Sequence, residues 1–115
     1  MRPFDFAIER ADEGDIAVVV VHGEIDLVTA PRVGGAVAAA NAASGVVLDL
    51  SDVDFLDSTG LRELLVAQRE LGGRLTIVCH PGGAAHRLMT VAGLNEALPL
   101  YERRSAALDA VCGAR

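Results

Sequence analysis

Apolar and polar positions along the chain predict strands that alternate with helices. Near the N-terminus the two kinds of residue alternate over residues 4–9, which is typical of a strand with one buried face. An acidic turn at residues 12–15 separates this strand from the β-branched run 16–21, which favours a more central strand. Two strands joined by a short polar turn predict an antiparallel hairpin. Residues 23–26 follow as a predicted loop or short edge segment.

The remainder of the chain continues this alternation. A helix is predicted over residues 30–43, with Thr29 as its N-cap and Pro31 in its first turn. Gly34 and Gly35 inside it cost about 1 kcal/mol each relative to alanine, which indicates that the helix packs closely against a neighbour. The further predicted elements are a strand at 46–50, an acidic loop at 51–57, a helix at 58–71, a strand at 75–79, a loop at 80–83, a helix at 84–92, an extended segment at 98–101 and a helix at 105–112.

This order of elements predicts one α/β domain over residues 1–115. Strands that alternate with helices form parallel sheets through right-handed crossovers. We therefore expect a mixed sheet of four or five strands, with an N-terminal antiparallel hairpin and about four helices. A chain of 115 residues is long enough for one hydrophobic core.

Composition and charge exclude several function classes. All 10 basic residues other than histidine are arginine, so the lysine of a phosphate-binding loop, of a Schiff-base enzyme or of a kinase is missing. A formal net charge of −6 disfavours nucleic acid and anionic membranes as partners. The longest apolar run without glycine, residues 16–21, is far shorter than the roughly 20 residues of a membrane helix. With no secretory signal in view, we expect a cytoplasmic protein.

The most unusual segment places acids and hydroxyl groups between a predicted strand and a predicted helix. It contains Asp54, Asp57, Ser58 and Thr59, followed by Gly60. In α/β proteins the segments after the carboxyl ends of parallel strands carry functional sites. Asp57 and Ser58 are also good N-cap residues, so a purely structural role for them stays open at this point.

Known enzyme motifs fit this segment poorly. An aspartyl phosphatase would need threonine or valine at position 56 and a lysine elsewhere, whereas the chain has Leu56 and no lysine. The sequence from Asp57 to Gly60 is one residue longer than the motif of an aspartic protease. Leu56 also breaks the Gly-x-Ser-x-Gly elbow of a serine hydrolase. We expect neither enzyme activity nor a cofactor.

The histidines and cysteines follow no metal-binding or redox motif. His22, His80 and His86 lack the spacing of a zinc site, so we expect surface or loop positions. Cys79 and Cys112 fit neither a CxxC motif nor a zinc pattern. In the cytoplasm both thiols would be reduced, and a redox role for the pair stays open.

Several stretches are arranged, in order and with compatible spacing, as in one known family. They are residues 23–26 with Thr29 and Ala30, residues 47–50, 55–61, 75–78 and 86–94. Together they resemble the STAS domain family, and within it the bacterial anti-sigma factor antagonists. The resemblance spans nearly the whole chain, and its most specific part is the Asp-Ser-Thr-Gly element from Asp57 to Gly60.

The resemblance implies a phosphorylation switch. In that family the first hydroxyl after the aspartate, here Ser58, is phosphorylated by a partner that is both a serine kinase and an anti-sigma factor. The unphosphorylated chain would bind this partner and free a sigma factor, and a phosphoserine phosphatase would reset the switch. The residues expected around the site and in contact with the partner are Asp26, Asp54, Asp57, Thr59 (the less favoured acceptor) and Gly60.

A second class of function stays open beside this one. A STAS-type scaffold or sensor module would bind other proteins or a small ligand without sigma-factor control. The two classes differ in whether binding depends on the charge at Ser58.

Overall fold

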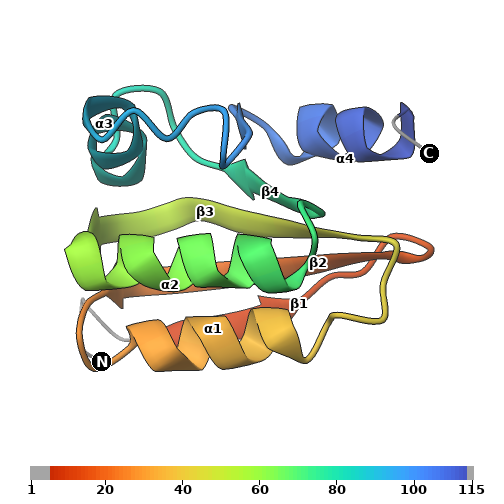
Figure 1. Ribbon diagram of the computed structural model, residues 1–115, viewed down its shortest axis with the longest axis horizontal. Helices are drawn as coiled ribbons and strands as arrows, with labels where there is room; N and C mark the ends of the chain where they lie inside the picture. Colours follow the sequence, from red (N-terminus) through yellow and green to blue (C-terminus); the bar gives the residue numbers. More distant parts are fainter. Residues whose placement is uncertain (1–5, 114–115) are drawn as a thin grey trace.

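The computed structural model describes residues 6–113, and this part of the chain folds around one five-stranded mixed sheet (Figure 1). The strands lie in the order β1-β2-β3-β4-β5, with β1 antiparallel to β2 and all other neighbours parallel. The elements are β1 (Ala7–Arg10), β2 (Ile16–Ile25), α1 (Ala30–Ala38), β3 (Gly45–Leu56), α2 (Ser58–Glu70), β4 (Leu75–Val78), α3 (Ala84–Val91), β5 (Leu100–Tyr101) and α4 (Arg104–Gly113). The predicted mixed sheet with an N-terminal hairpin and four helices is confirmed.

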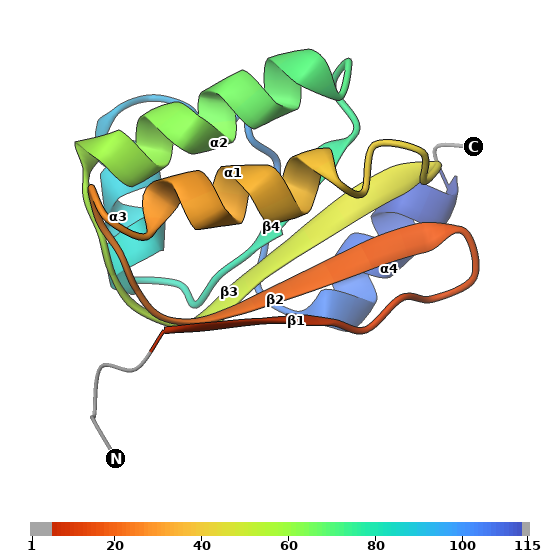
Figure 2. The same ribbon diagram turned by 90° about the horizontal axis from the view of Figure 1, so that it is seen from below.

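The helices cover the two faces of the sheet unequally. Successive residues of a strand point to opposite faces. Val46 and Leu48 therefore join the larger core under α1, α2 and α3, whereas Val47 joins a smaller core under α4. Figure 2 shows α1 and α2 side by side over the same face. Because β2 and β3 are covered on both faces along much of their length, they consist of nearly continuous apolar runs there.

The main departure from prediction lies just before Ser58. Residues 51–57 are predicted as an acidic loop, but β3 continues through them to Leu56. Residues 23–25, predicted as part of a loop or short edge segment, continue β2 to Ile25. The two extensions pair with each other in parallel, with Ile25 opposite Leu56 and two register shifts along the way. Each extension supplies the backbone hydrogen bonds that the other needs, which outweighs the poor strand propensity of the acids.

The first helix is shorter than predicted and ends at Ala38 instead of residue 43. Beyond it the backbone closes tighter turns, in which the Ala40 N–H donates to the Val37 carbonyl at 3.0 Å. The guanidinium of Arg74, the residue before β4, donates to the Ala43 carbonyl in this region. The turns after the helix are therefore held by a residue that lies 31 positions beyond Ala43 in the chain. The predicted first strand starts at residue 7, and residues 4 and 5 lie outside the described residues.

Gly34 allows α1 and α2 to pack closely, as its position in the predicted helix suggested. A Cβ atom at Gly34 would fall on the carboxylate of Glu63 in α2, whereas a Cβ at Gly35 would meet nothing within 4 Å. The carboxylate of Glu63 is therefore turned toward α1.

A buried ion pair joins α4 to the centre of β3. Asp49 is only 5% exposed, and its Oδ2 accepts a hydrogen bond from Nε of Arg104 at 3.1 Å and forms an ion pair with Nη2 at 3.0 Å. Its Oδ1 accepts one from the Ser51 N–H at 2.9 Å. Burial alone would raise the pKa of Asp49, but the hydrogen bonds from Ser51 and Arg104 outweigh it, and the pKa is lowered.

His22 links the first three strands of the sheet. Its Nε2 lies 2.7 Å from Oε1 of Glu9 on β1, and its Nδ1 lies 3.0 Å from Oδ2 of Asp52 on β3. The hydrogen bond with Glu9 is the main reason why the pKa of His22 is raised. The imidazole thus ties the edge strand β1 to the sheet at a position that the sequence indicated only as surface or loop.

The Asp49–Arg104 pair predicts a pH-dependent loss of stability in Arg104→Gln. Removing the guanidinium leaves a buried carboxylate without its counter-ion. Since Arg104 itself is 41% exposed, the cost at neutral pH should be about 1 to 2 kcal/mol in the free energy of unfolding, less than for a fully buried pair. Urea unfolding measures this cost.

The pH dependence of this cost has a defined sign. Because the pKa of Asp49 is lowered in the fold, the stability that it contributes is present at neutral pH and is lost as pH falls below its ordinary value of 3.8. The difference between the variant and the unmodified chain should shrink in that range. Arg103→Gln, an exposed neighbour, is the matched control. An equal loss in both variants would show that the ion pair contributes nothing specific.

Candidate functional site

Ser58, the predicted phosphorylation residue, is exposed at the first position of α2. Asp57 is the N-cap of this helix, and its Oδ1 accepts a hydrogen bond from the Gly60 N–H at 3.0 Å. The extended backbone of Asp57 turns the chain from the end of β3 into the helix. Asp57 thus has the capping role that its residue type allowed, and the cap leaves the neighbouring hydroxyl on the surface.

Gly60 lets the start of α2 pack against the ends of β2 and β3. A Cβ atom there would lie 2.5 Å from Cδ1 of Leu56 and 2.7 Å from Cγ2 of Ile25. The Asp57 N–H donates to the Ile25 carbonyl at 3.2 Å, which joins the end of β2 to the same turn. Gly60 is buried, so it lies beneath Ser58 rather than beside it on the surface.

A tight loop after β2 lies next to this turn and is organised by Asp26. Oδ1 of Asp26 accepts hydrogen bonds from the N–H groups of Val28 (2.9 Å) and Thr29 (3.0 Å). These bonds, chiefly the one from Thr29, lower the pKa of Asp26. The Thr29 hydroxyl donates to the Glu24 carbonyl at 2.7 Å instead of capping α1. Backbone N–H groups of the loop therefore stabilise the carboxylate of Asp26. The side chains of Leu27 and Val28 in the same loop are 71% and 78% exposed.

The two remaining predicted residues differ in accessibility. Thr59 is half-buried, so Ser58 is the more accessible of the two hydroxyl groups. Asp54 is exposed on β3, where a register shift in the pairing with β2 leaves it without an opposite residue. Asp26, Asp54 and Asp57 thus all lie near the carboxyl ends of β2 and β3, around the start of α2.

The apolar part of this surface was not predicted from the sequence. Leu27, Val28 and Phe55 are large apolar residues that the fold leaves exposed, with Phe55 at 45%. All three lie in segments next to the acids named above. In the sequence, Phe55 lies inside the predicted acidic loop 51–57, and Leu27 and Val28 directly follow the predicted loop or edge segment 23–26. Exposed apolar groups rimmed by polar residues are typical of protein-binding surfaces.

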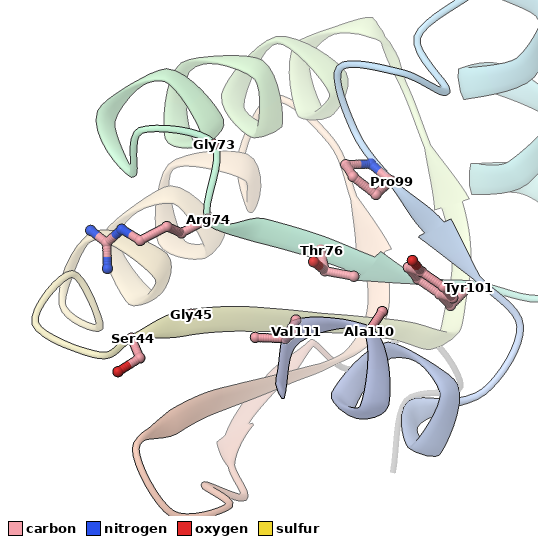
Figure 3. Close-up of a pocket in the computed structure, with 9 residues that line it drawn as sticks. All are labelled: Ser44, Gly45, Gly73, Arg74, Thr76, Pro99, Tyr101, Ala110 and Val111. Atoms are coloured by element: carbon pink, nitrogen blue, oxygen red, sulfur yellow. The ribbon is translucent and has the colours of Figure 1, made fainter. Parts of the chain in front are cut away.

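A cavity of about 340 Å³ lies between α4 and the strands β4 and β5 (Figure 3). Ser44 and Gly45 line it at the start of β3, and β3 then extends for 12 residues, roughly 35 Å, before Ser58. In Figure 3 the Arg74 guanidinium points away from Thr76 and toward the loop after α1. Because this guanidinium already donates to backbone carbonyls, the cavity offers little charge to a ligand.

The cysteines are free thiols in different surroundings. Cys79 is buried, and desolvation raises its pKa to about 11, whereas Cys112 is exposed on α4. Within residues 6–113, no group of three or more histidine, cysteine or acidic side chains is arranged to hold a metal ion. In the same part of the chain, no helix has the length and apolar character needed to cross a membrane.

Comparison with known proteins agrees with this geometry. A family model described as "Mlab, STAS domain" matches residues 8–102, which is most of the chain. The chain belongs to the STAS domain family. The resemblance predicted from the Asp-Ser-Thr-Gly element and its flanking segments is confirmed.

Similar proteins are known from sequence and from structure. The chain is 32% identical over 116 residues to the anti-sigma-F factor antagonist RsfB of Mycobacterium tuberculosis, covering 98% of this chain and 95% of RsfB. It is 36% identical, with a TM-score of 0.87, to the crystal structure of an anti-sigma factor antagonist from Mycobacterium paratuberculosis, covering 96% and 97% of the two chains. The Bacillus antagonist SpoIIAA in its unphosphorylated form has a TM-score of 0.74 at 21% identity, over 95% and 97% of the chains, which shows a shared fold.

The packing beneath the site predicts that this STAS domain tolerates alanine at Gly35 but not at Gly60. The added Cβ at Gly60 collides with Leu56 and Ile25, so we expect a loss of about 1 to 3 kcal/mol in the free energy of unfolding. Gly35→Ala is the control: it adds a methyl group to an open helical position and should stabilise the fold by up to about 1 kcal/mol. Chemical denaturation measures both. Equal stability of the two variants would contradict the close packing.

Proposed function

We propose that this STAS domain is an anti-sigma factor antagonist, a regulatory binding protein rather than an enzyme. Unphosphorylated, it binds an anti-sigma factor with serine kinase activity and so releases a sigma factor. Phosphorylation of Ser58 ends this binding, and a phosphoserine phosphatase restores it. The observation that carries the proposal is the exposed Ser58 hydroxyl at the capped start of α2, beside an ordered loop with exposed apolar side chains. The names of the similar proteins support it.

The surface around Ser58 has the composition that a switchable partner contact needs. Leu27, Val28 and Phe55 supply apolar area whose burial would stabilise a complex. Asp26 and Asp54 border this area with negative charge. A partner that fits this surface carries an apolar patch with basic groups nearby. We propose the cytoplasm as the place of this interaction, with neither nucleic acid nor membrane as a partner.

Phosphorylation at Ser58 would change the surface without unfolding the domain. A phosphate adds a charge of about −1.5 to −2 at neutral pH. The first turn of a helix accommodates negative charge, and the N-cap bond from Asp57 to Gly60 does not involve the Ser58 side chain. The same phosphate lies close to Asp57 and adds charge and bulk to the contact surface. A loss of about 3 to 4 kcal/mol in binding would weaken the complex several hundredfold.

The alternative, a sensor module that binds a small ligand without sigma-factor control, finds less support. Such a module would use the cavity between α4 and β4. The Arg74 guanidinium near it is committed to backbone carbonyls, and the Ser44 hydroxyl donates to Asp15 at 2.6 Å. The exposed apolar and acidic groups gather instead at the opposite end of the sheet, around Ser58.

Charge substitution at Ser58 tests the proposed switch. Ser58→Ala should stay folded and capture an ATP-binding serine kinase from the native lysate, because it cannot be phosphorylated. Ser58→Glu should lose that partner through added charge. Affinity capture with identification by mass spectrometry measures both, and circular dichroism checks the fold.

Ser105→Glu is the matched control for this experiment, since Ser105 is also an exposed serine in the first turn of a helix. It should capture the same kinase as the unmodified chain. If Ser58→Glu and Ser58→Ala capture the same proteins and no kinase is among them, Ser58 is not a switch and the domain is a constitutive binding module.

Two substitutions separate the capping role of Asp57 from its proposed role in partner recognition. Asp57→Asn keeps an acceptor for the Gly60 N–H and should leave the free energy of unfolding nearly unchanged, whereas Asp57→Ala should lose about 0.5 to 2 kcal/mol. We expect Asp57→Asn to be phosphorylated more slowly by the captured kinase, because the charge beside Ser58 is gone. A phosphorylation rate equal to that of the unmodified chain would leave Asp57 with capping alone.

A further inference from the structure

Arg62 lies one helical turn after Ser58 on the exposed side of α2 and has no ion-pair partner within residues 6–113. The helix neighbours of a residue are those three and four positions away. For Arg62 these neighbours are Ser58, Thr59, Leu65 and Val66, and none of them is acidic. Ser58 is thus the exposed neighbour that phosphorylation would turn into an anion.

The adjacent acid, Glu63, does not occupy the guanidinium of Arg62. Its carboxylate lies over Gly34 of α1, on the side of α2 that packs against the neighbouring helix. Glu63 is half-buried there, whereas Arg62 is exposed. The positive charge of Arg62 is therefore available on the same stretch of helix surface as the Ser58 hydroxyl.

The helix geometry directs Arg62 toward Ser58. Side chains on a helix lean toward its N-terminus, so a residue covers the surface of the preceding turn. Residues at positions i and i+4 have Cβ atoms about 6 Å apart, and an anion that precedes a cation at this spacing is the favourable orientation. A guanidinium presents several N–H donors in a plane that matches two phosphate oxygens.

We propose that Arg62 is the internal counter-ion of the phosphate on Ser58. The inference rests on the proposed phosphorylation of Ser58. The guanidinium holds the phosphate against the first turn of α2 and offsets part of its charge, while Asp57 next to it repels the phosphate. The phosphorylated domain keeps its stability in this way, and the remaining negative charge faces the partner surface.

The test uses the full chain with phosphoserine incorporated at position 58 during translation, so that no kinase is needed. Arg62→Gln and Arg69→Gln are compared with the unmodified chain, each with serine and with phosphoserine at position 58. Arg69 is the matched control: it is an exposed arginine of α2, is also followed by glutamate, and has no acidic neighbour three or four positions away.

We expect Arg62→Gln to lower the Tm of the phosphorylated form by about 2 °C more than that of the unphosphorylated form. Arg69→Gln should affect the two forms equally. In 1 M salt the extra loss in Arg62→Gln should disappear, because an exposed pair is screened.

Phosphorus NMR titration gives a readout that a merely structural role of Arg62 would not move. A nearby guanidinium favours the dianion, so the second pKa of the phosphate should be higher in Arg62→Gln than in the unmodified chain and in Arg69→Gln. If both variants have the same phosphate pKa and the same Tm differences, the proposal is overturned. Since the phosphate is installed without a partner, this result is independent of whether the kinase and sigma factor are found.

Discussion

The site depends on the parallel pairing that carries β2 and β3 to Ile25 and Leu56. This pairing brings two segments from different parts of the chain to one edge of the sheet. The hydrogen bond from the Asp57 N–H to the Ile25 carbonyl then joins the end of β2 to the start of α2. If β2 ended at Val21 and β3 at Leu50, as their apolar runs suggest, the strand pairing would not fix the position of Ser58 relative to the Asp26 loop.

Side-chain capping and close packing both order this edge of the sheet. Asp57 accepts a hydrogen bond from a backbone N–H at the start of α2, and Asp26 accepts one from a backbone N–H of its loop. Both carboxylates are therefore held in place by backbone N–H groups. Because Gly60 has no Cβ atom, the start of α2 can pack directly against the ends of both strands. The groups left free for a partner are then the Ser58 hydroxyl, the apolar side chains of the loop and β3, and Arg62. A rigid frame with exposed, uncommitted side chains is what a surface switched by one charge requires.

Sequence patterns predicted most of the fold because the core elements are locally consistent. The bounds of α2, β4, α3, β5 and α4 agree with prediction within two residues, since apolar periodicity and glycine ends mark them clearly. The prediction failed for α1 and for the ends of β2 and β3. In those places contacts come from distant residues: Arg74 donates to carbonyls in the turns that replace the end of the predicted first helix, and residues 51–56 pair with the neighbouring strand.

The sequence by itself determined the α/β order of elements and the absence of lysine chemistry, because these depend on residue type, order and local spacing, and its resemblance to the STAS family implied Ser58 as the proposed acceptor. Only the tertiary structure decided that Asp57 caps α2, that Gly60 is buried beneath the site, and that Leu27, Val28 and Phe55 are exposed around it. It also separated Glu63, whose carboxylate lies over Gly34 of α1, from its neighbour Arg62, which is exposed. Side-chain burial and pairing depend on which elements become neighbours in space, and long-range backbone pairing decides that.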